Sequence, residues 1–172
     1  MQLRVAGIIK ESVVDGPGLR LVVFTQGCPH RCPGCHNPHT WDPAGGTPVE
    51  VEEVLDMVQK NPLLKGVTFS GGEPFVQAGA LACLAREVRV LGRDVITYTG
   101  YTWEELLELA KWDGAVRDLL ELSDYIVDGP YIKEKRDPSL PFRGSSNQRI
   151  IDVHASLASG RVVIASWGSC PV

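Results

Sequence analysis

Short runs of apolar residues, some alternating with polar ones, recur along the chain and predict β-strands. The clearest run covers 19–26, and a less regular alternation over 3–9 is typical of an edge strand. Further strands are predicted over 65–70, 94–99 and 124–128, with closing strands over 149–153 and 161–165.

Segments with helical periodicity separate these strands. The first helix is predicted to begin with Thr47 as its N-cap and Pro48 at its first helical position. Its apolar stripe consists of Val51, Val54, Leu55 and Val58. Three further helices are predicted over 77–91, 102–111 and 114–122, and Thr102 with Glu105 forms a capping box.

This alternation of strands and helices indicates an α/β fold made of parallel β/α units. Four or five such units are too few for a closed eight-stranded barrel, which needs about 250 residues. We therefore expect a partial, open β/α barrel or a curved sheet, in a single domain over 1–172. The segment 129–147 is rich in Pro, Gly, Ser and charged residues and is predicted to be a long ordered loop or lid.

Composition and charge exclude two classes of partner. The net charge is −4, and no basic run is long enough to indicate nucleic-acid binding through phosphates. The N-terminal residues are charged too early for a signal peptide, and no apolar run approaches about 20 residues, so no membrane segment is expected. The sequence predicts a cytoplasmic protein.

Three of the five cysteines lie close together, in the spacing C-x-x-x-C-x-x-C: Cys28, Cys32 and Cys35. In a reducing compartment, clustered cysteines bind metal or carry out redox chemistry more often than they form disulfides. Cys83 is interpreted as a buried small hydrophobe on a helix, and Cys170 as an incidental thiol.

The spacing is compatible with two metal centres. One is structural zinc, with His30, His36 or His39 as the fourth ligand. The other is an iron–sulfur cluster, in which three cysteines leave one iron open to a non-protein ligand. The cysteines are packed together and no second C-x-x-C exists, which favours the cluster.

Four polar or glycine-rich loops each follow a predicted strand: the cysteine loop, 70–74, 97–100 and 128–130. In parallel α/β folds the carboxyl ends of the strands converge on the ligand site. The sequence therefore predicts one site where these loops meet.

The cysteine motif resembles that of the radical S-adenosylmethionine enzymes. Its surroundings, Val-Asp-Gly-Pro-Gly-Leu-Arg over 14–20 and His-Asn-Pro over 36–38 with Trp41, resemble the glycyl-radical-enzyme activases. The segments 97–102, 125–131 and 142–149 are similar to the activating subunits of anaerobic (class III) ribonucleotide reductases. The similar segments spread from about residue 14 to about residue 153.

This resemblance implies that Cys28, Cys32 and Cys35 hold a [4Fe-4S] cluster and that S-adenosyl-L-methionine chelates the fourth iron. A flavodoxin or ferredoxin-type donor would supply one electron. The resulting 5'-deoxyadenosyl radical would remove a hydrogen atom from a glycine of the large catalytic subunit of the reductase. Two alternatives remain: the same chemistry on another glycyl-radical enzyme such as pyruvate formate-lyase, or a zinc-stabilised binding module.

The resemblance also assigns residues to the cofactor. Gly34 and His36 would lie beside it, while Gly71 and Gly72 would let backbone carbonyls approach the ammonium group of S-adenosylmethionine. The carboxylate of Glu73 would complement that positive charge, although Glu73 can instead cap the helix that follows.

Four further polar residues are candidates for the site. Thr97 and Thr99 are assigned to the ribose or methionine part of the ligand, and Asp128 to a cation or a polar group of the lid. Asp15 is assigned to positioning the glycine-bearing peptide. The alternatives are ordinary polar residues at strand ends and, for Asp15, a turn residue.

Overall fold

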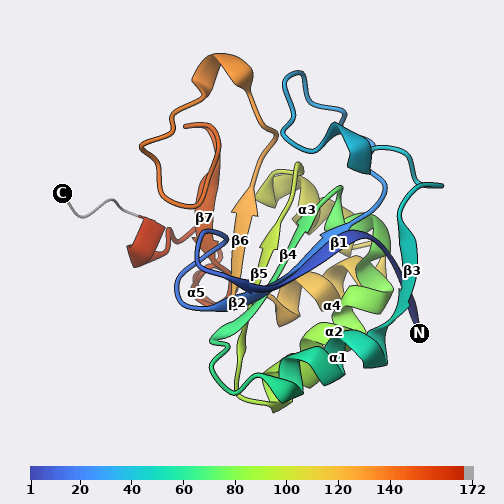
Figure 1. Ribbon diagram of the computed structural model, residues 1–172. Helices are drawn as coiled ribbons and strands as arrows, with labels where there is room; N and C mark the ends of the chain where they lie inside the picture. The colour runs from blue at the N-terminus through green and yellow to red at the C-terminus, as the bar shows by residue number, and fades with distance from the viewer. Residues whose placement is uncertain (169–172) are drawn as a thin grey trace.

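The computed structural model describes residues 1–168, which form a mixed seven-stranded sheet in the order β3-β1-β2-β4-β5-β6-β7 (Figure 1). The strands are β1 (Gln2–Ser12), β2 (Arg20–Thr25), β3 (Thr47–Glu50), β4 (Gly66–Gly71), β5 (Asp94–Tyr98), β6 (Tyr125–Asp128) and β7 (Arg149–Asp152). The four central strands β2, β4, β5 and β6 run parallel, whereas β1, β3 and β7 pair in antiparallel fashion.

Five α-helices are described, and all but the last lie in the connections between parallel strands. They are α1 (Val51–Lys60), α2 (Ala78–Val90), α3 (Trp103–Ala110), α4 (Gly114–Leu122) and α5 (Val153–Ser159), with short 3-10 turns η1 (Pro38–Thr40), η2 (Pro74–Gln77), η3 (Lys133–Lys135) and η4 (Ser166–Gly168). Three parallel crossovers result, so the expectation of four or five units was wrong, while the α/β class is confirmed. The sheet is open, with β3 and β7 as its edges.

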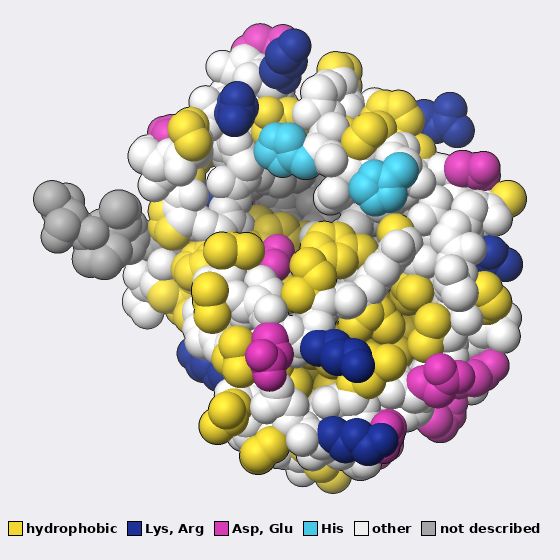
Figure 2. Space-filling view, in the orientation of Figure 1, with side chains coloured by type: hydrophobic (Ala, Val, Ile, Leu, Met, Phe, Trp, Pro, Cys, Tyr) yellow, Lys and Arg dark blue, Asp and Glu magenta, His cyan; other side chains and the backbone are white. Residues whose placement is uncertain are grey.

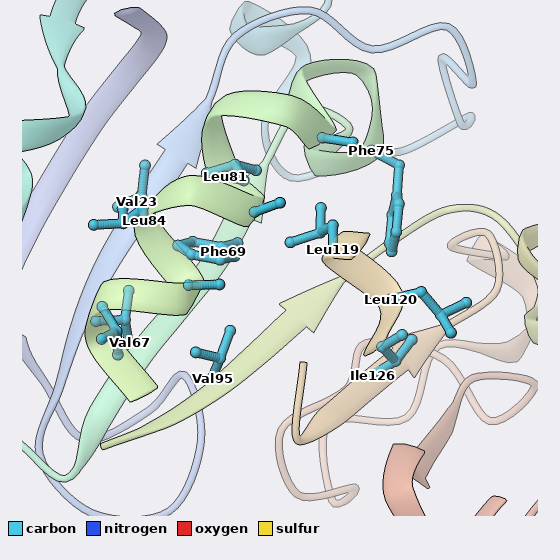
Figure 3. Close-up of a cluster of buried hydrophobic side chains, with 14 of the residues drawn as sticks. Val23, Val67, Phe69, Phe75, Leu81, Leu84, Val95, Leu119, Leu120 and Ile126 are labelled. Atoms are coloured by element: carbon cyan, nitrogen blue, oxygen red, sulfur yellow. The ribbon is translucent and has the colours of Figure 1, made fainter. Parts of the chain in front are cut away.

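The main hydrophobic core lies between the sheet and helices α1 to α4 (Figure 3). Phe69 of β4 and Ile126 of β6 are fully buried there against Leu81, Leu84 and Leu119 of the helices. Burying each such side chain contributes about 1.5–3 kcal/mol. Among the described residues, this core takes no side chain from 27–47, so the cysteine loop lies outside it.

The opposite face of the sheet carries a smaller cluster. Ile96, Val127 and Ile150 pack there with the partly buried rings of Tyr98 and Phe142. Side chains alternate along a strand, so in β5 residue 97 faces the helices while its neighbours face the other side. This second face is therefore the one available to a ligand.

The first helix begins later than predicted. Residues 47–50 form β3, which pairs with β1 and places Leu3 opposite Val49. The helix begins at Val51, and Glu50 precedes it without a side-chain capping bond. Proline at position 48 is compatible with this result because β3 is an edge strand, where a missing amide donor is tolerated. It follows that β1 is not an edge strand, contrary to the prediction.

The C-terminal part also differs from the prediction. Residues 161–165 form no strand; only an isolated bridge joins Ile151 to Ile164. Helix α5, which was not predicted, follows β7 directly, with the side chain of Asp152 accepting from the amide of Ala155. The capping box of Thr102 and Glu105 at α3 is confirmed.

Two statements about the whole chain remain. Cys83 lies on α2 as predicted but is only partly buried, and Cys170 lies outside the described residues. Within residues 1–168, no helix is both long enough and apolar enough to cross a membrane.

Candidate functional site

A cavity of about 270 Å³ opens where the carboxyl ends of the parallel strands meet. In Figure 2 it is a hollow bordered by histidine side chains. Its lining comes from the hairpin and β2 (Asp15, Phe24), the cysteine loop (Cys28, His30, Cys32, Cys35, His36, Asn37, Trp41), the end of β4 (Ser70, Gly71, Gly72), the end of β5 (Tyr98, Thr99, Gly100) and the segment after β6 (Gly129, Tyr131, Gly144, Gln148). The structure therefore brings the four predicted loops together.

All three clustered cysteines line this cavity as half-buried free thiols. Backbone hydrogen bonds close the loop that carries them: the amide of Gly27 donates to the carbonyl of Thr40, and that of Cys28 to the carbonyl of Trp41. Cys35 donates back to the carbonyl of Cys32 (3.0 Å). These bonds hold the three thiols on one side of a single cavity.

These thiols fit an iron–sulfur cluster. Burial raises the pKa of the Cys28 thiol, and backbone hydrogen bonds from His30 and Arg31 act in the opposite direction. The amide of Asn37 donates to the Sγ of Cys35 (3.3 Å). Amide donors to sulfur stabilise the thiolates that ligate iron and are one means of tuning a cluster. Three cysteines would leave one iron of a [4Fe-4S] cluster without a protein ligand of this set.

The zinc alternative gains no support from the histidines. His30 Nε2 is 2.8 Å from the carboxylate of Glu73, and the ring of His36 lies 5.0 Å from that of Tyr131. His39 is exposed in η1. Across residues 1–168, no three His, Cys, Asp or Glu side chains are gathered around the position of a single ion.

Gly71 and Gly72 line the cavity at the end of β4, and both positions require glycine. Gly71 has a φ of 94°, and a Cβ there would lie 2.6 Å from the amide nitrogen of Thr25. A Cβ on Gly72 would lie 2.4 Å from the carbonyl oxygen of Gly27. The two glycines thus let β4 end directly against the start of the cysteine loop.

Glu73 does not line the cavity; it is fully buried behind it. Its carboxylate accepts hydrogen bonds from His30, from the hydroxyl of Thr99 and from the amides of Gly100 and Phe75. The bond from Phe75 is the helix-capping role considered as the alternative, here at η2.

The two threonines of β5 lie in different places. Thr99 lines the cavity, whereas Thr97 points toward the helices and lies 2.8 Å from the hydroxyl of Ser123. Tyr98, between them, faces the cavity and donates its hydroxyl to the carbonyl of Phe142 (2.6 Å). Burial raises the pKa of Tyr98. Side-chain alternation in the strand is the signal that identifies Tyr98, and sequence reasoning did not use it.

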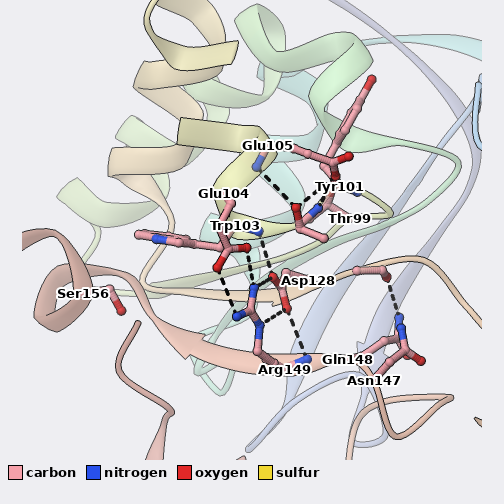
Figure 4. A network of polar contacts seen from close by, with 12 residues as sticks. Thr99, Tyr101, Trp103, Glu104, Glu105, Asp128, Asn147, Gln148, Arg149 and Ser156 are labelled. Carbon is pink, nitrogen blue, oxygen red and sulfur yellow. Dashed lines mark hydrogen bonds and ion pairs between the residues drawn. The ribbon is translucent and has the colours of Figure 1, made fainter. Parts of the chain in front are cut away.

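Asp128 is buried and does not line the cavity (Figure 4). It accepts from the amide of Trp103 (2.8 Å) and from the Nε (3.1 Å) and Nη2 (2.5 Å) of Arg149. Arg149 also forms two bonds with Glu104, at 2.8 and 3.2 Å. These bonds raise the pKa of Arg149 and lower that of Glu104. The network ties the start of α3 to β7.

Asp15 lines the cavity from the turn between β1 and β2. Its carboxylate accepts from the hydroxyl of Ser12 (2.5 Å), and its carbonyl accepts from Thr68 (2.8 Å). The buried Arg20 supports this turn through Thr68 (2.7 Å) and an ion pair with Asp94 (2.5 Å).

The segment 129–147 contacts the cysteine loop. Gly34 does not line the cavity, but with a φ of 77° it lies against Lys133, which would be 3.2 Å from a Cβ at that position. Tyr131 and Gln148 line the cavity, although sequence reasoning did not single them out. The prediction of an ordered loop near the site could have pointed to both.

Comparison with known proteins places this site in a class. Residues 14–151 match the family model described as a 4Fe-4S single cluster domain, so the chain is of the single-cluster iron–sulfur class. It is 37% identical over 146 residues to the anaerobic ribonucleoside-triphosphate reductase-activating protein of Vibrio cholerae, covering 80% of this chain and 90% of that protein. The proteins of the same name from Escherichia coli K12 (34% over 144 residues, 79% and 90% covered) and Enterobacteria phage T4 (34% over 144 residues, 80% and 86%) are also similar. The chain belongs to the family of anaerobic ribonucleoside-triphosphate reductase-activating proteins.

This membership confirms the resemblance inferred from the motifs. Among solved structures, QueE from Escherichia coli aligns with 59% of this chain and 54% of its own, at 21% identity and a TM-score of 0.47.

Proposed function

We propose that this protein is a radical S-adenosylmethionine activase that generates the glycyl radical of an anaerobic ribonucleoside-triphosphate reductase. The observation that carries the proposal is the convergence of Cys28, Cys32 and Cys35 with three strand-end loops on one cavity. Membership of the activating-protein family supports the same conclusion. We further interpret the open sheet as a partial β/α barrel of the radical S-adenosylmethionine type, forming one domain over 1–172.

In this proposal Cys28, Cys32 and Cys35 would hold a [4Fe-4S] cluster and leave one of its irons without a cysteine ligand. Together with S-adenosylmethionine, the bound cluster would supply one-electron reductive cleavage to methionine and a 5'-deoxyadenosyl radical, the species needed to take a hydrogen atom from a glycine Cα. Gly71 and Gly72 line the cavity, and in this proposal their backbone would accept from the ammonium group of the ligand.

The chain's own contribution is binding, orientation and exclusion of water. His36 and Tyr131, with ring centroids 5.0 Å apart, join the cysteine loop to the segment 129–147 across the cavity. Tyr98, Thr99 and Asp15 form part of its lining, and we place the glycine-bearing peptide beside Asp15. These groups would keep stray hydrogen donors away from the reactive radical.

Two partners follow from this proposal. The large catalytic subunit of the reductase supplies the glycine, and a flavodoxin or ferredoxin-type protein supplies the electron. We place the reaction in the cytoplasm, under anaerobic conditions.

Low-temperature EPR tests the proposal. The protein is reconstituted anaerobically with iron and sulfide, then mixed with dithionite, S-adenosylmethionine and the anaerobic reductase, while 5'-deoxyadenosine is assayed in parallel. A glycyl-radical doublet on the reductase, together with 5'-deoxyadenosine, is the expected result.

The matched control replaces Cys35 with Ser, and Cys83→Ser serves as a cysteine variant outside the site. Cys35→Ser should give neither signal, and Cys83→Ser should give both. 5'-Deoxyadenosine without the doublet would overturn the assignment of the reductase as partner. Stoichiometric zinc with neither iron nor 5'-deoxyadenosine would overturn the proposal as a whole.

A further inference from the structure

The carboxylate of Glu73 links the cysteine loop to the end of β5. Its Oε2 is 2.8 Å from His30 Nε2 and 2.9 Å from the amide of Gly100, while its Oε1 accepts from the amide of Phe75 (3.0 Å). The hydroxyl of Thr99 contacts both oxygens, at 2.9 and 3.0 Å. The amides of Gly100 and Phe75 donate to this carboxylate, and we assign His30 the tautomer with its proton on Nε2, in which the ring donates to Glu73 as well.

His30 lies midway between Cys28 and Cys32, and its ring is held on two sides. One edge meets Glu73, and the ring stands 4.5 Å from that of Tyr101 at an interplanar angle of 77°. Gly100 provides the space: a Cβ on this residue would lie 2.4 Å from the ring of His30. The side chain of His30 therefore lies against Gly100 and Tyr101, two consecutive positions after β5, and against Glu73.

The backbone next to His30 adopts an unfavourable conformation, which neighbouring contacts must hold. Arg31, the next residue, has a φ of 47°, a backbone conformation that residues other than glycine adopt only at a cost in free energy. Arg31 also lies between two of the clustered cysteines, Cys28 and Cys32. If the ring of His30 were released, this stretch would be free to leave its strained conformation and the two cysteines would lose their fixed positions.

We propose that His30 is a positioning residue that fixes the cysteine loop through Glu73, so that Cys28 and Cys32 are in place before the cluster binds. The role of this positioning in cluster binding rests on the proposed function, whereas the contacts of His30 do not depend on it. Glu73 then acts through His30 and Thr99 and does not touch the ligand, because both of its oxygens are engaged and it is fully buried. Bonds between a buried carboxylate and its donors are strong because little solvent competes for them.

Hydrogen–deuterium exchange on the cluster-free protein tests this positioning directly. In His30→Ala the amides of 29–36 should exchange about tenfold faster, the factor expected when a hydrogen bond to a charged group is lost from a loop that opens locally. Gly100→Ala should give the same result without changing the loop, because the added Cβ displaces the ring. Exchange in β4 and β5 should be unchanged in both variants.

Two further variants make the readout specific. His39→Ala changes an exposed histidine of the same segment and should leave exchange over 29–36 as in the unchanged protein. His30→Gln keeps a donor able to reach Glu73 and should restore most of the protection. Unchanged exchange in both His30→Ala and Gly100→Ala, with the fold intact by circular dichroism, would overturn the proposal. So would equal loss of protection in His30→Gln and His30→Ala.

Cluster assembly supplies the second readout. After anaerobic reconstitution, His30→Ala and Gly100→Ala should hold less iron per chain than the unchanged protein and give a broadened EPR signal when reduced, whereas His30→Gln should approach the normal values. Normal iron content and an unaltered EPR signal in both disrupted variants would contradict the positioning role. If the unchanged protein itself takes up no iron, the proposed function fails, and exchange over 29–36 alone decides whether His30 holds the loop.

Discussion

Adjacent residues of β5 serve opposite faces of the sheet. Thr97 lies among the helices and Tyr98 lines the cavity, because side chains alternate along a strand. Ser123 already donates its hydroxyl to the carbonyl of Leu119 (2.8 Å), so the proton between Thr97 and Ser123 belongs to Thr97. The hydroxyl of Thr97 is therefore a structural donor with no path to a ligand.

Thr97→Val should lower stability and leave ligand binding unchanged. The variant removes one buried donor and leaves no other donor without an acceptor, because Ser123 still donates to Leu119. The free energy of unfolding should therefore fall by about 1 kcal/mol. Urea unfolding measures this change, and the affinity of the reconstituted protein for S-adenosylmethionine is measured by equilibrium dialysis. A large loss of affinity at unchanged stability would place Thr97 at the ligand after all.

The ion pair of Arg149 and Glu104 should make a pH-dependent contribution to the free energy of unfolding. The hydrogen bond from Arg149 lowers the pKa of Glu104 below its usual 4.5, so the folded state binds this proton less readily than the unfolded state. The stabilisation is fully present above pH 4.5 and is lost as the pH falls through the lower, folded-state pKa. Because Glu104 is largely exposed, this stabilisation amounts to only about a few tenths of a kcal/mol.

Urea unfolding of Glu104→Gln tests this contribution. At neutral pH the variant should be slightly less stable than the unchanged protein, and the gap should close as the pH falls below 4.5. Glu134→Gln, at an exposed glutamate of η3, serves as the control and should show no such closing gap. A gap that widens in acid would contradict the assigned direction of the pKa.

At the scale of elements, the segment 129–147 is held over the open face by a few specific bonds. Tyr98 donates to the carbonyl of Phe142, whose φ of 57° is uncommon for a residue with a side chain. Gln148 accepts from the amides of Gly144 and Ser145 and donates to the carbonyl of Gly129 (3.1 Å). These bonds give the segment one conformation although it contains only the short turn η3.

Tyr98→Phe should loosen this segment and little else. Loss of the hydroxyl removes the bond that holds Phe142, so amides over 139–146 should exchange about tenfold faster while the core strands keep their protection. Tyr125→Phe is the matched control, because the described contact of that tyrosine is through its ring, 5.1 Å from that of Trp167. Equal effects of the two variants would argue against a role for the Tyr98 hydroxyl.

The sequence was sufficient for elements whose signals are local. The capping box at Thr102 and the strands that lead to each site loop were predicted within a few residues. Residues 47–50 were assigned to a helix because Thr47 and Pro48 form a local start signal, yet pairing with β1 prevailed, and such long-range pairing is invisible to local reasoning. The isolated bridge at Ile164 and helix α5 likewise depend on tertiary contacts.

The same limit applies to the site. Gly71, Gly72 and the three cysteines of the cavity were predicted because their residue types indicate close approach and ligation. Gly34 was predicted on the same ground but does not line the cavity. The positions of Glu73 and Asp128 were not, because a buried carboxylate next to a site looks the same in sequence whether it faces a ligand or another side chain. Glu73 faces His30 and Asp128 faces Arg149, and both partners come from segments distant in the chain.

At the scale of the whole molecule, the cysteine loop lies outside the hydrophobic core and is joined to the sheet by hydrogen bonds. The main core lies between the sheet and four helices, and within the described residues it takes no side chain from 27–47. Some backbone bonds do join the loop to the sheet, such as that from the amide of Glu73 to the carbonyl of Gly27 (2.8 Å). The free energy of folding therefore comes mainly from apolar burial that needs no metal.

Removal of the metal centre should consequently leave the protein folded. A variant with Cys28, Cys32 and Cys35 all changed to Ser should keep its circular dichroism spectrum and a cooperative thermal transition, and Leu119→Ala should lose about 2–5 kcal/mol because it leaves a cavity in the core. In a zinc-stabilised module the order is reversed, since there the metal supplies the folding free energy and chelation unfolds the chain. Thermal unfolding of the two variants, each with and without a chelator, distinguishes these cases. If the triple-serine variant were unfolded while Leu119→Ala stayed folded, the metal centre and not the apolar core would supply most of the folding free energy.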